Sequence, residues 1–130
     1  MTPFQNERMA PVFGAFDPEA RAALEGLREM IFDVATGLTE VTGVEESLKW
    51  GQPSYAPKPK TGTPIRLGVT KGGEATLFVH CQTTLVSDLE ADNAHGLRTI
   101  DNRAVVLPLE GVADHPGLRG FVRAALTYHL

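Results

Sequence analysis

The sequence predicts an α+β fold in which helices near the two ends pack on a mostly antiparallel sheet of about five strands. Three observations lead to this prediction. An amphipathic helical pattern follows Asp17, a second one follows residue 114, and short strand-like runs between turn residues fill the middle. The expected order of elements is α-β-β-β-α-β-β-α, which is typical of an α+β domain. A chain of 130 residues holds one hydrophobic core, so residues 17–130 are expected to form a single domain.

Residues 1–16 are expected to form an irregular arm in front of this domain. The prolines and the glycine of this segment disfavour regular structure. Its aromatic side chains are expected to dock on the body of the protein, and they belong to Phe4, Phe13 and Phe16.

The first helix is expected to begin at Asp17-Pro18. Aspartate is a favoured N-cap residue, and proline is favoured at the first helical position because its missing N–H would have no partner there. Gly37 and Gly43 bracket the expected end of the helix. One face is expected in the core because apolar residues recur at helical spacing, at Ala20, Ala23, Leu24, Leu27, Met30, Ile31, Val34 and Leu38.

The segment after this helix predicts one strand and one loop. Residues 46–50 alternate in a strand pattern, with Glu46, Leu48 and Trp50 on the buried side. An abrupt Gly-Gln-Pro turn follows. Residues 56–64 hold three prolines and predict a loop without regular structure.

Two hairpins and two helices are expected in the second half of the chain. The first hairpin joins residues 65–69 to 75–81 through a pair of glycines, which supply the positive φ that tight turns require. The second joins residues 97–100 to 103–109. A short helix is expected over residues 84–92, and the last helix is expected to start at Asp114 or His115.

Composition excludes several classes of protein. A hydrophobic content of 42% with 22% charged residues is ordinary for a globular protein and does not indicate disorder. The net charge of −4 argues against nucleic acid as a partner. The one cysteine, Cys81, forbids an internal disulfide and fits a reducing compartment. No apolar run approaches the ~20 residues of a membrane span, and no signal peptide is visible, so a cytoplasmic location is expected.

The region around the only tryptophan is the favoured binding site. Trp50, Gln52, Pro53 and Tyr55 follow one another closely, and Arg66 supplies positive charge at the rim. An aromatic floor with a few polar groups and a cation would suit a small anionic or planar ligand. The alternative interpretation is structural: Trp50 fills the core, and Tyr55 anchors the proline-rich loop.

A second candidate site lies on the first helix. Glu25, Glu29 and Asp33 recur every four residues, so three carboxylates line one stripe and could hold an iron ion loosely. The alternative is a solvated face, because Arg21 and Arg28 lie near enough to form ion pairs.

His80-Cys81 does not predict a catalytic dyad. Neighbours on a strand point to opposite faces, so Cys81 is expected in the core, and His80 on the other face is a possible ligand contact. Motifs for zinc, for a phosphate-binding loop and for a serine nucleophile are all missing from the sequence. A non-catalytic protein is therefore expected.

Four stretches resemble one family, in that family's order. They are residues 44–55 with Trp50-Gly-Gln-Pro53, residues 75–86, residues 102–109 and residues 118–129. These stretches are similar to the YdhG-like family of bacterial domains, also called domain of unknown function 1801. The resemblance implies an α+β fold, and it implies a frataxin-like role in iron delivery through the association of some members with that role.

The sequence thus predicts a cytosolic binding module, monomeric or homodimeric, for a small molecule or a protein. The predicted ligand contacts are Trp50, Gln52, Pro53, Tyr55, Arg66 and His80. No cofactor is expected. The alternative function is an iron carrier that uses Glu25, Glu29 and Asp33.

Overall fold

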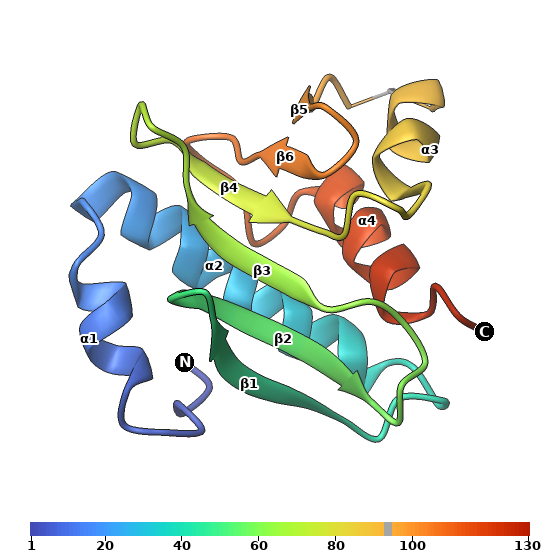
Figure 1. Ribbon diagram of the computed structural model, residues 1–130, viewed down its shortest axis with the longest axis horizontal. Coiled ribbons are helices and arrows are strands. Elements are labelled where there is room, and N and C mark those ends of the chain that lie inside the picture. The colour runs from blue at the N-terminus through green and yellow to red at the C-terminus, as the bar shows by residue number, and fades with distance from the viewer. Residues whose placement is uncertain (93–94) are drawn as a thin grey trace.

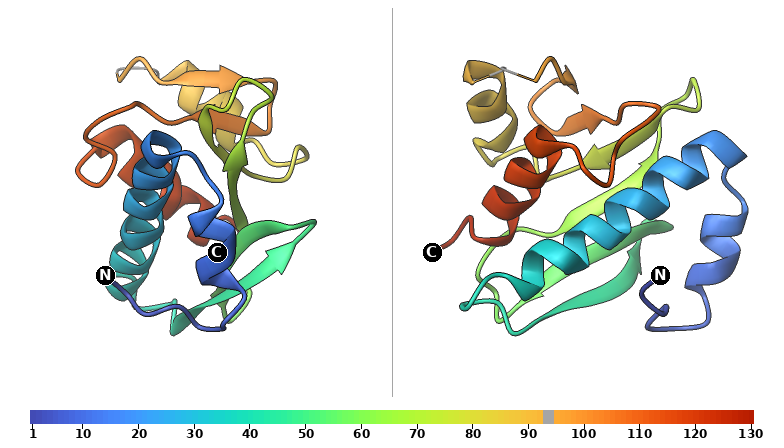
Figure 2. Two further views of the ribbon diagram at one scale, coloured as in Figure 1. Left: turned by 90° about the vertical axis from the view of Figure 1, so that its left-hand side faces the viewer. Right: turned by 180° about the vertical axis from the view of Figure 1, so that it is seen from behind.

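A six-stranded antiparallel sheet forms the centre of the fold, and helices α2 and α4 pack on one of its faces (Figures 1 and 2). The computed structural model describes residues 1–92 and 95–130. The strand order is β1-β2-β3-β4-β6-β5, and every neighbouring pair is antiparallel. The predicted α+β class is confirmed, with one strand and one helix more than expected. In chain order the elements are α1 Met9–Gly14, α2 Pro18–Thr36, β1 Gly43–Lys49, β2 Gln52–Lys58, β3 Ile65–Val69, β4 Ala75–Phe78, α3 Leu85–Ala91, β5 Arg98–Ile100, β6 Ala104–Val106 and α4 Pro116–Leu126.

Helix α2 follows its sequence pattern closely. Asp17 takes the N-cap position with extended backbone angles, and Pro18 is the first helical residue, although the Asp17 side chain makes no capping hydrogen bond. The apolar stripe predicted for this helix is buried along its whole length. Arg28 is also fully buried on this helix, which the amphipathic pattern did not predict.

The β1–β2 hairpin corrects two expectations. The turn consists of Trp50 and Gly51, with φ values of 55° and 75°, so the chain reverses at the tryptophan instead of burying it. Strand β2 then runs through Pro53 and Pro57 into the segment expected to be a loop. Proline is tolerated here because β2 pairs along its length with β1, whereas only Ser54 and Tyr55 of β2 pair with β3.

The other predicted elements are confirmed with shorter bounds. The β3–β4 hairpin turns through Gly73 at φ 83°, and the β5–β6 hairpin turns through Asp101 at φ 50°. Helix α4 begins after His115, whose Nδ1 accepts a hydrogen bond from the Leu118 N–H at 3.2 Å. Strand β4 ends at Phe78, so Cys81 lies beyond the sheet and is exposed. The expectation that Cys81 belongs to the core is wrong, because it assumed a longer strand.

The N-terminal arm is not irregular, since it contains α1. The expected docking of its aromatics is confirmed: Phe13 is fully buried, and Phe4 and Phe16 pack against the core. Phe4 and Phe13 stack with their ring centroids 5.6 Å apart. The arm is therefore part of the body of the protein.

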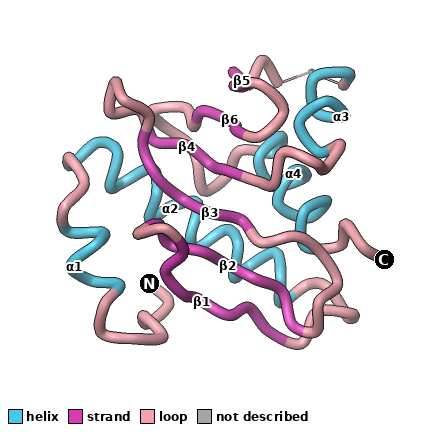
Figure 3. Tube along the Cα trace, viewed as in Figure 1, coloured by secondary structure: helices cyan, strands magenta, loops and turns pink. Residues whose placement is uncertain are grey.

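The C-terminal segment after α4 packs against the loop that joins β2 to β3 (Figure 3). The Thr63 N–H donates to the Ala125 carbonyl at 2.9 Å, and the His129 N–H donates to the Thr61 carbonyl at 2.8 Å. A side chain at Gly62 would collide with the backbone at the end of α4, so this close approach requires glycine. The contact carries Tyr128 and His129 toward the sheet. None of the helices described combines the length and apolar character that a membrane crossing requires.

Candidate functional site

The two faces of the β1–β2 hairpin hold different kinds of polar side chain. Successive residues of a strand point to opposite faces. Glu46 and Tyr55 face α2, whereas Ser47 and Ser54 face away from the helices. The inner face is described first, because it explains which predicted site residues serve the fold.

A buried ion pair joins α2 to β1 on the inner face. Arg28 Nε donates to Glu46 Oε2 at 2.6 Å, and Arg28 Nη2 donates to Glu46 Oε1 at 3.1 Å. The Tyr55 hydroxyl donates to Glu46 Oε2 at 2.7 Å, and the Gln5 N–H donates to Glu46 Oε1 at 2.9 Å. Both Arg28 and Tyr55 are fully buried. The Glu46 carboxylate therefore accepts four hydrogen bonds in the interior.

Two further hydrogen bonds of Arg28 go to the N-terminal arm. Nη1 donates to the Thr2 carbonyl at 2.6 Å, and Nη2 donates to the Pro3 carbonyl at 3.1 Å. The guanidinium also lies 4.5 Å from the Phe4 ring centroid and 5.0 Å from that of Phe32. Arg28 is thus held on every side by α2, β1 and the arm.

Burial and hydrogen bonding oppose each other in setting the pKa of Glu46. Burial disfavours the charged carboxylate, but the hydrogen bonds from Arg28, Gln5 and Tyr55 outweigh it and hold the pKa of Glu46 below its ordinary value. Burial, together with the bond to Glu46, raises the pKa of the Tyr55 phenol far above its ordinary value. The cluster consequently stays as a charged pair with a neutral phenol across the physiological range.

Tyr55 and Pro53 therefore do not share a cleft with Trp50. Both are buried, and both lie on the inner face by strand alternation. The expectation that Tyr55 lines the cleft is wrong. Tyr55 directly follows Ser54 in β2, so its side chain points to the opposite face of the sheet. Tyr55 has a structural role instead, since its hydroxyl binds Glu46 and its ring packs edge-on against Phe32; its anchoring of the proline-rich loop stays a prediction.

A hollow of about 660 Å³ lies on the outer face of the sheet. Among the described residues no helix covers this face of β1, β2 and β3 (Figure 1). The structure brings three predicted site residues to it from separate segments: Trp50 at the hairpin tip, Arg66 in β3 and His80 after β4. The lining consists of Glu45, Ser47, Lys49, Trp50, Ser54, Ala56, Thr63, Pro64, Arg66, His80, Gln82, Thr83, Tyr128 and His129.

Trp50 is the most exposed large apolar side chain of the described chain, at 92%. The interpretation that it fills the core is therefore wrong. Its positive φ is disfavoured for a bulky residue, and a two-residue turn of this type favours asparagine before glycine. Gln52 lies beside the hollow, where its Oε1 accepts a hydrogen bond from Arg66 Nη1 at 3.4 Å.

Sequence reasoning missed the C-terminal wall of the hollow. The Tyr128 hydroxyl accepts a hydrogen bond from the Thr84 N–H at 2.9 Å, across 44 residues of sequence. The His129 ring lies edge-on to the Tyr128 ring, with the centroids 5.3 Å apart. In the sequence, the only indication of this wall is that Tyr128 and His129 follow the last helix. That position does not show which strand the two side chains reach.

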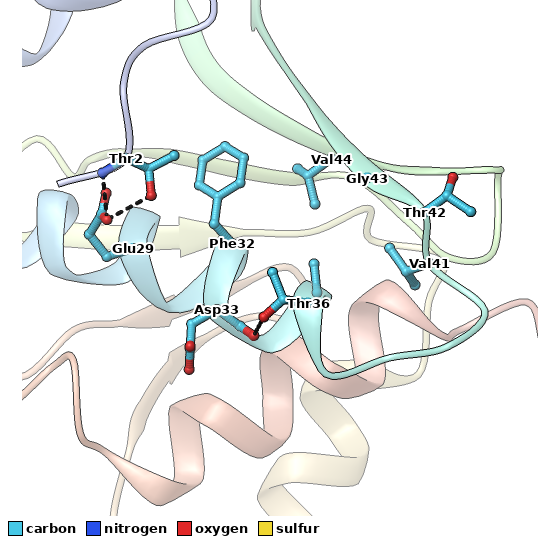
Figure 4. Close-up of a pocket in the computed structure, with 10 residues that line it drawn as sticks. Thr2, Glu29, Phe32, Asp33, Thr36, Val41, Thr42, Gly43 and Val44 are labelled. Atoms are coloured by element: carbon cyan, nitrogen blue, oxygen red, sulfur yellow. Dashed lines mark hydrogen bonds between the residues drawn. The ribbon is translucent and has the colours of Figure 1, made fainter.

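The carboxylate stripe on α2 borders a second hollow, of about 570 Å³, between α2 and β1 (Figure 4). Glu29 Oε1 accepts from the Thr2 N–H and from the Thr2 hydroxyl, both at 2.8 Å, and Glu29 Oε2 accepts from Arg28 at 3.0 Å. Asp33 points to the other side and pairs with Arg119. Glu25 pairs with Arg21 at 3.4 Å.

Each carboxylate of the stripe thus has its own cationic partner. Across residues 1–92 and 95–130, no group of three or more His, Cys, Asp or Glu side chains is placed to hold a metal ion. Iron binding by Glu25, Glu29 and Asp33 stays a prediction from spacing and resemblance.

The fold and the hollow define an α+β domain whose sheet has one open, polar and partly aromatic face. Comparison with family models, with curated proteins and with solved structures gives no match for this chain. The resemblance to the YdhG-like family accordingly stays a prediction. The function must be argued from the hollow itself.

Proposed function

We propose that this protein is a non-catalytic module that binds a small organic molecule in the hollow on the outer face of the sheet. The observation that supports this most strongly is the convergence of Trp50, Arg66 and His80 from three segments around one hollow. A volume of about 660 Å³ lies within the range of roughly 300–1,000 Å³ that small-molecule sites occupy.

The position of Trp50 supports a role outside folding. An exposed fraction of 92% means that the indole contributes little burial energy. Its left-handed backbone conformation costs stability for a residue of this kind. A large aromatic side chain that is disfavoured in its turn and barely buried is well suited to cover a ligand.

The shape of the outer face favours a small molecule as the ligand over a protein partner with a flat surface. The β1–β2 turn lies at one end of the sheet, and the C-terminal segment lies at the other (Figure 1). Trp50 belongs to the first and Tyr128 to the second, and both line the same hollow. A ligand lying along the strands would therefore meet an aromatic side chain at each end.

Fluorescence of Trp50 tests this proposal directly, because the chain has only one tryptophan. A library of uncharged and charged fragments would be added to the protein, with the emission maximum recorded for each. Binding in the hollow is expected to move the emission to shorter wavelength as the exposed indole is covered. An emission spectrum that no fragment changes would overturn the proposal.

Matched variants separate specific binding from general effects. Arg66→Met removes a cation from the hollow, and Arg8→Met removes an exposed cation at the start of α1, outside it. For a fragment that occupies the hollow, the change in Trp50 emission is expected to differ between Arg66→Met and the native protein. The change in Arg8→Met is expected to equal that in the native protein.

A further inference from the structure

We infer that the ligand is a small planar anion, with a carboxylate or phosphate group that binds Arg66 and Lys49 and a flat ring that stacks on Trp50. This inference rests on the proposed function and adds the chemical class of the ligand. It is argued from the charges, the hydrogen-bond donors and the aromatic side chain that line the hollow.

The hollow brings two cationic side chains together on one face of the sheet. Arg66 and Lys49 line it, and neither has a carboxylate partner within the described chain. The one acidic residue of the lining, Glu45, already pairs with Lys58 at 3.8 Å. The chain as a whole carries a net charge of −4, so this concentration of cations runs against its composition. A site of this kind attracts an anion.

Arg66 has one hydrogen bond, and most of its donors are unused. Its Nη1 donates to Gln52 Oε1 at 3.4 Å, which is long for such a bond. The Gln52 side chain lies over Gly68, where an added Cβ would come within 2.7 Å of Gln52 Nε2. The glycine therefore makes room for the Gln52 amide, which contacts the guanidinium. The planar fork matches the two oxygens of a carboxylate or phosphate.

His80 is placed to donate to the same ligand, beside the Tyr128 ring. His80 Nδ1 accepts a hydrogen bond from the Gln82 N–H at 3.1 Å, so the neutral ring carries its proton on Nε2. The Tyr128 hydroxyl accepts from the Thr84 N–H at 2.9 Å and lies 3.4 Å from the Thr84 hydroxyl, which itself donates to Asp88, so Tyr128 contributes its ring to the wall. Lys49, Arg66 and His80 together make a lining rich in donors, and a ligand rich in acceptors complements it.

The exposed indole determines the other half of the ligand. An inorganic anion would fill a small part of about 660 Å³ and would leave Trp50 uncovered. A flat ring attached to the anionic group would reach Trp50 and stack on it. The carboxylate and the phosphate share the chemistry that Arg66 recognises, and the experiment distinguishes them.

Isothermal titration calorimetry with four naphthalene probes tests the inference. Naphthalene-2-carboxylate and 2-naphthyl phosphate carry the two anionic groups, naphthalene-2-carboxamide is a neutral isostere, and 2-naphthylmethylammonium is a cation. At least one anion is expected to bind at least about tenfold more tightly than the amide, because a charge-assisted bond to arginine is lost with the charge. The ammonium is expected not to bind. The tighter of the two anions identifies the group that the natural ligand carries.

Variants assign the effect to the hollow. Arg66→Met is expected to weaken anion binding by about 10- to 100-fold, and Arg66→Lys by less, because lysine keeps the charge without the fork. Arg8→Met is expected to bind as the native protein does. Circular dichroism confirms that each variant is folded before titration.

Two results would overturn the inference, and they bear differently on the proposed function. If the amide or the ammonium binds as tightly as the anions, the ligand need not be an anion. The proposal that the hollow binds a small molecule would still stand. Failure of all four probes to bind would also overturn the inference of an anionic ligand. The screen of the fragment library by Trp50 fluorescence would then test the proposed function separately.

Discussion

The inner and outer faces of the sheet at the β1–β2 hairpin differ in how a neighbouring arginine is held: Arg28 of α2 lies against the inner face, and Arg66 of β3 lies on the outer face. On the inner face Arg28, Glu46 and Tyr55 are buried, and each is hydrogen-bonded to the others or to the arm. On the outer face Arg66 has one long hydrogen bond and no carboxylate partner within the described residues.

This difference separates a structural role from a binding role. A satisfied buried cluster has no donor to offer a ligand, and breaking it is expensive because a charge is left behind in the interior. Donors that converge around an open hollow cost little to remove and are available to a ligand. Replacement of arginine by methionine should therefore lower stability on the inner face and weaken ligand binding on the outer face.

The largest expected effect comes from Arg28→Met. The variant leaves the Glu46 carboxylate buried without its cation, and it is expected to lower the free energy of unfolding by about 3–5 kcal/mol. Urea unfolding measures the change. Arg66→Met serves as the outer-face control and is expected to change stability by less than about 0.5 kcal/mol. Equal losses in the two variants would contradict the distinction between the faces.

Glu46→Gln is expected to remove a dependence of stability on acid pH. The folded protein holds the pKa of Glu46 below its ordinary value, so its contribution to stability is present above about pH 4.3 and is lost as the pH falls through the lower folded pKa. At pH 7 the variant is expected to be less stable by about 2–3 kcal/mol, since hydrogen bonds to a charged group are weakened.

The gap between native protein and Glu46→Gln should narrow steadily on acidification. Urea unfolding at a series of pH values from 7 to 3 measures that gap. Other carboxylates titrate in both proteins, so the difference isolates Glu46. A gap that stays constant over this range would contradict the assignment.

Gln5→Ala tests how the arm is attached to the edge of the sheet. The Gln5 side chain donates to the Val44 carbonyl at 2.7 Å and accepts from the Glu46 N–H at 2.8 Å, so it covers the free edge of β1. Its loss is expected to cost about 1–2 kcal/mol. Hydrogen exchange should show the Glu46 amide losing protection first, and an unchanged exchange rate there would contradict this account.

The smallest expected change in stability is a gain. Trp50→Asn places the preferred residue in the Trp50–Gly51 turn and is expected to raise the free energy of unfolding by about 1 kcal/mol. The same variant should lose binding of naphthalene-2-carboxylate. A variant that is destabilised would show that the indole serves the fold, against its assignment to the ligand.

Local pattern was enough to predict helices α2, α3 and α4 and two of the hairpins, but it missed the short helix α1. The apolar spacing of α2 and the Asp17-Pro18 start come from interactions within a few residues, and the structure follows them. Strand β2 was missed because its prolines argue against a strand. They are tolerated only because the pairing with β3 is so short, which the local sequence does not encode.

The site was predictable only in part, because its geometry depends on contacts between distant segments. Trp50 and Arg66 were identified by residue type, but the position of the indole depended on a turn type that usually carries asparagine. Arg28 looked like a surface charge until Glu46 was placed beside it, 18 residues away in sequence. Tyr128 reaches the hollow through a contact with Thr84 that no local pattern indicates.

The most direct test of the difference between the faces is a nuclear magnetic resonance titration of ¹⁵N-labelled protein with naphthalene-2-carboxylate. The indole N–H of Trp50 and the Nε–H groups of Arg66 and Arg28 report on the two faces in one experiment. We predict that the Trp50 and Arg66 signals move together and saturate, while the Arg28 signal stays fixed by its bond to Glu46. Movement of the Arg28 signal with a silent Arg66, or no movement of either, would contradict the account.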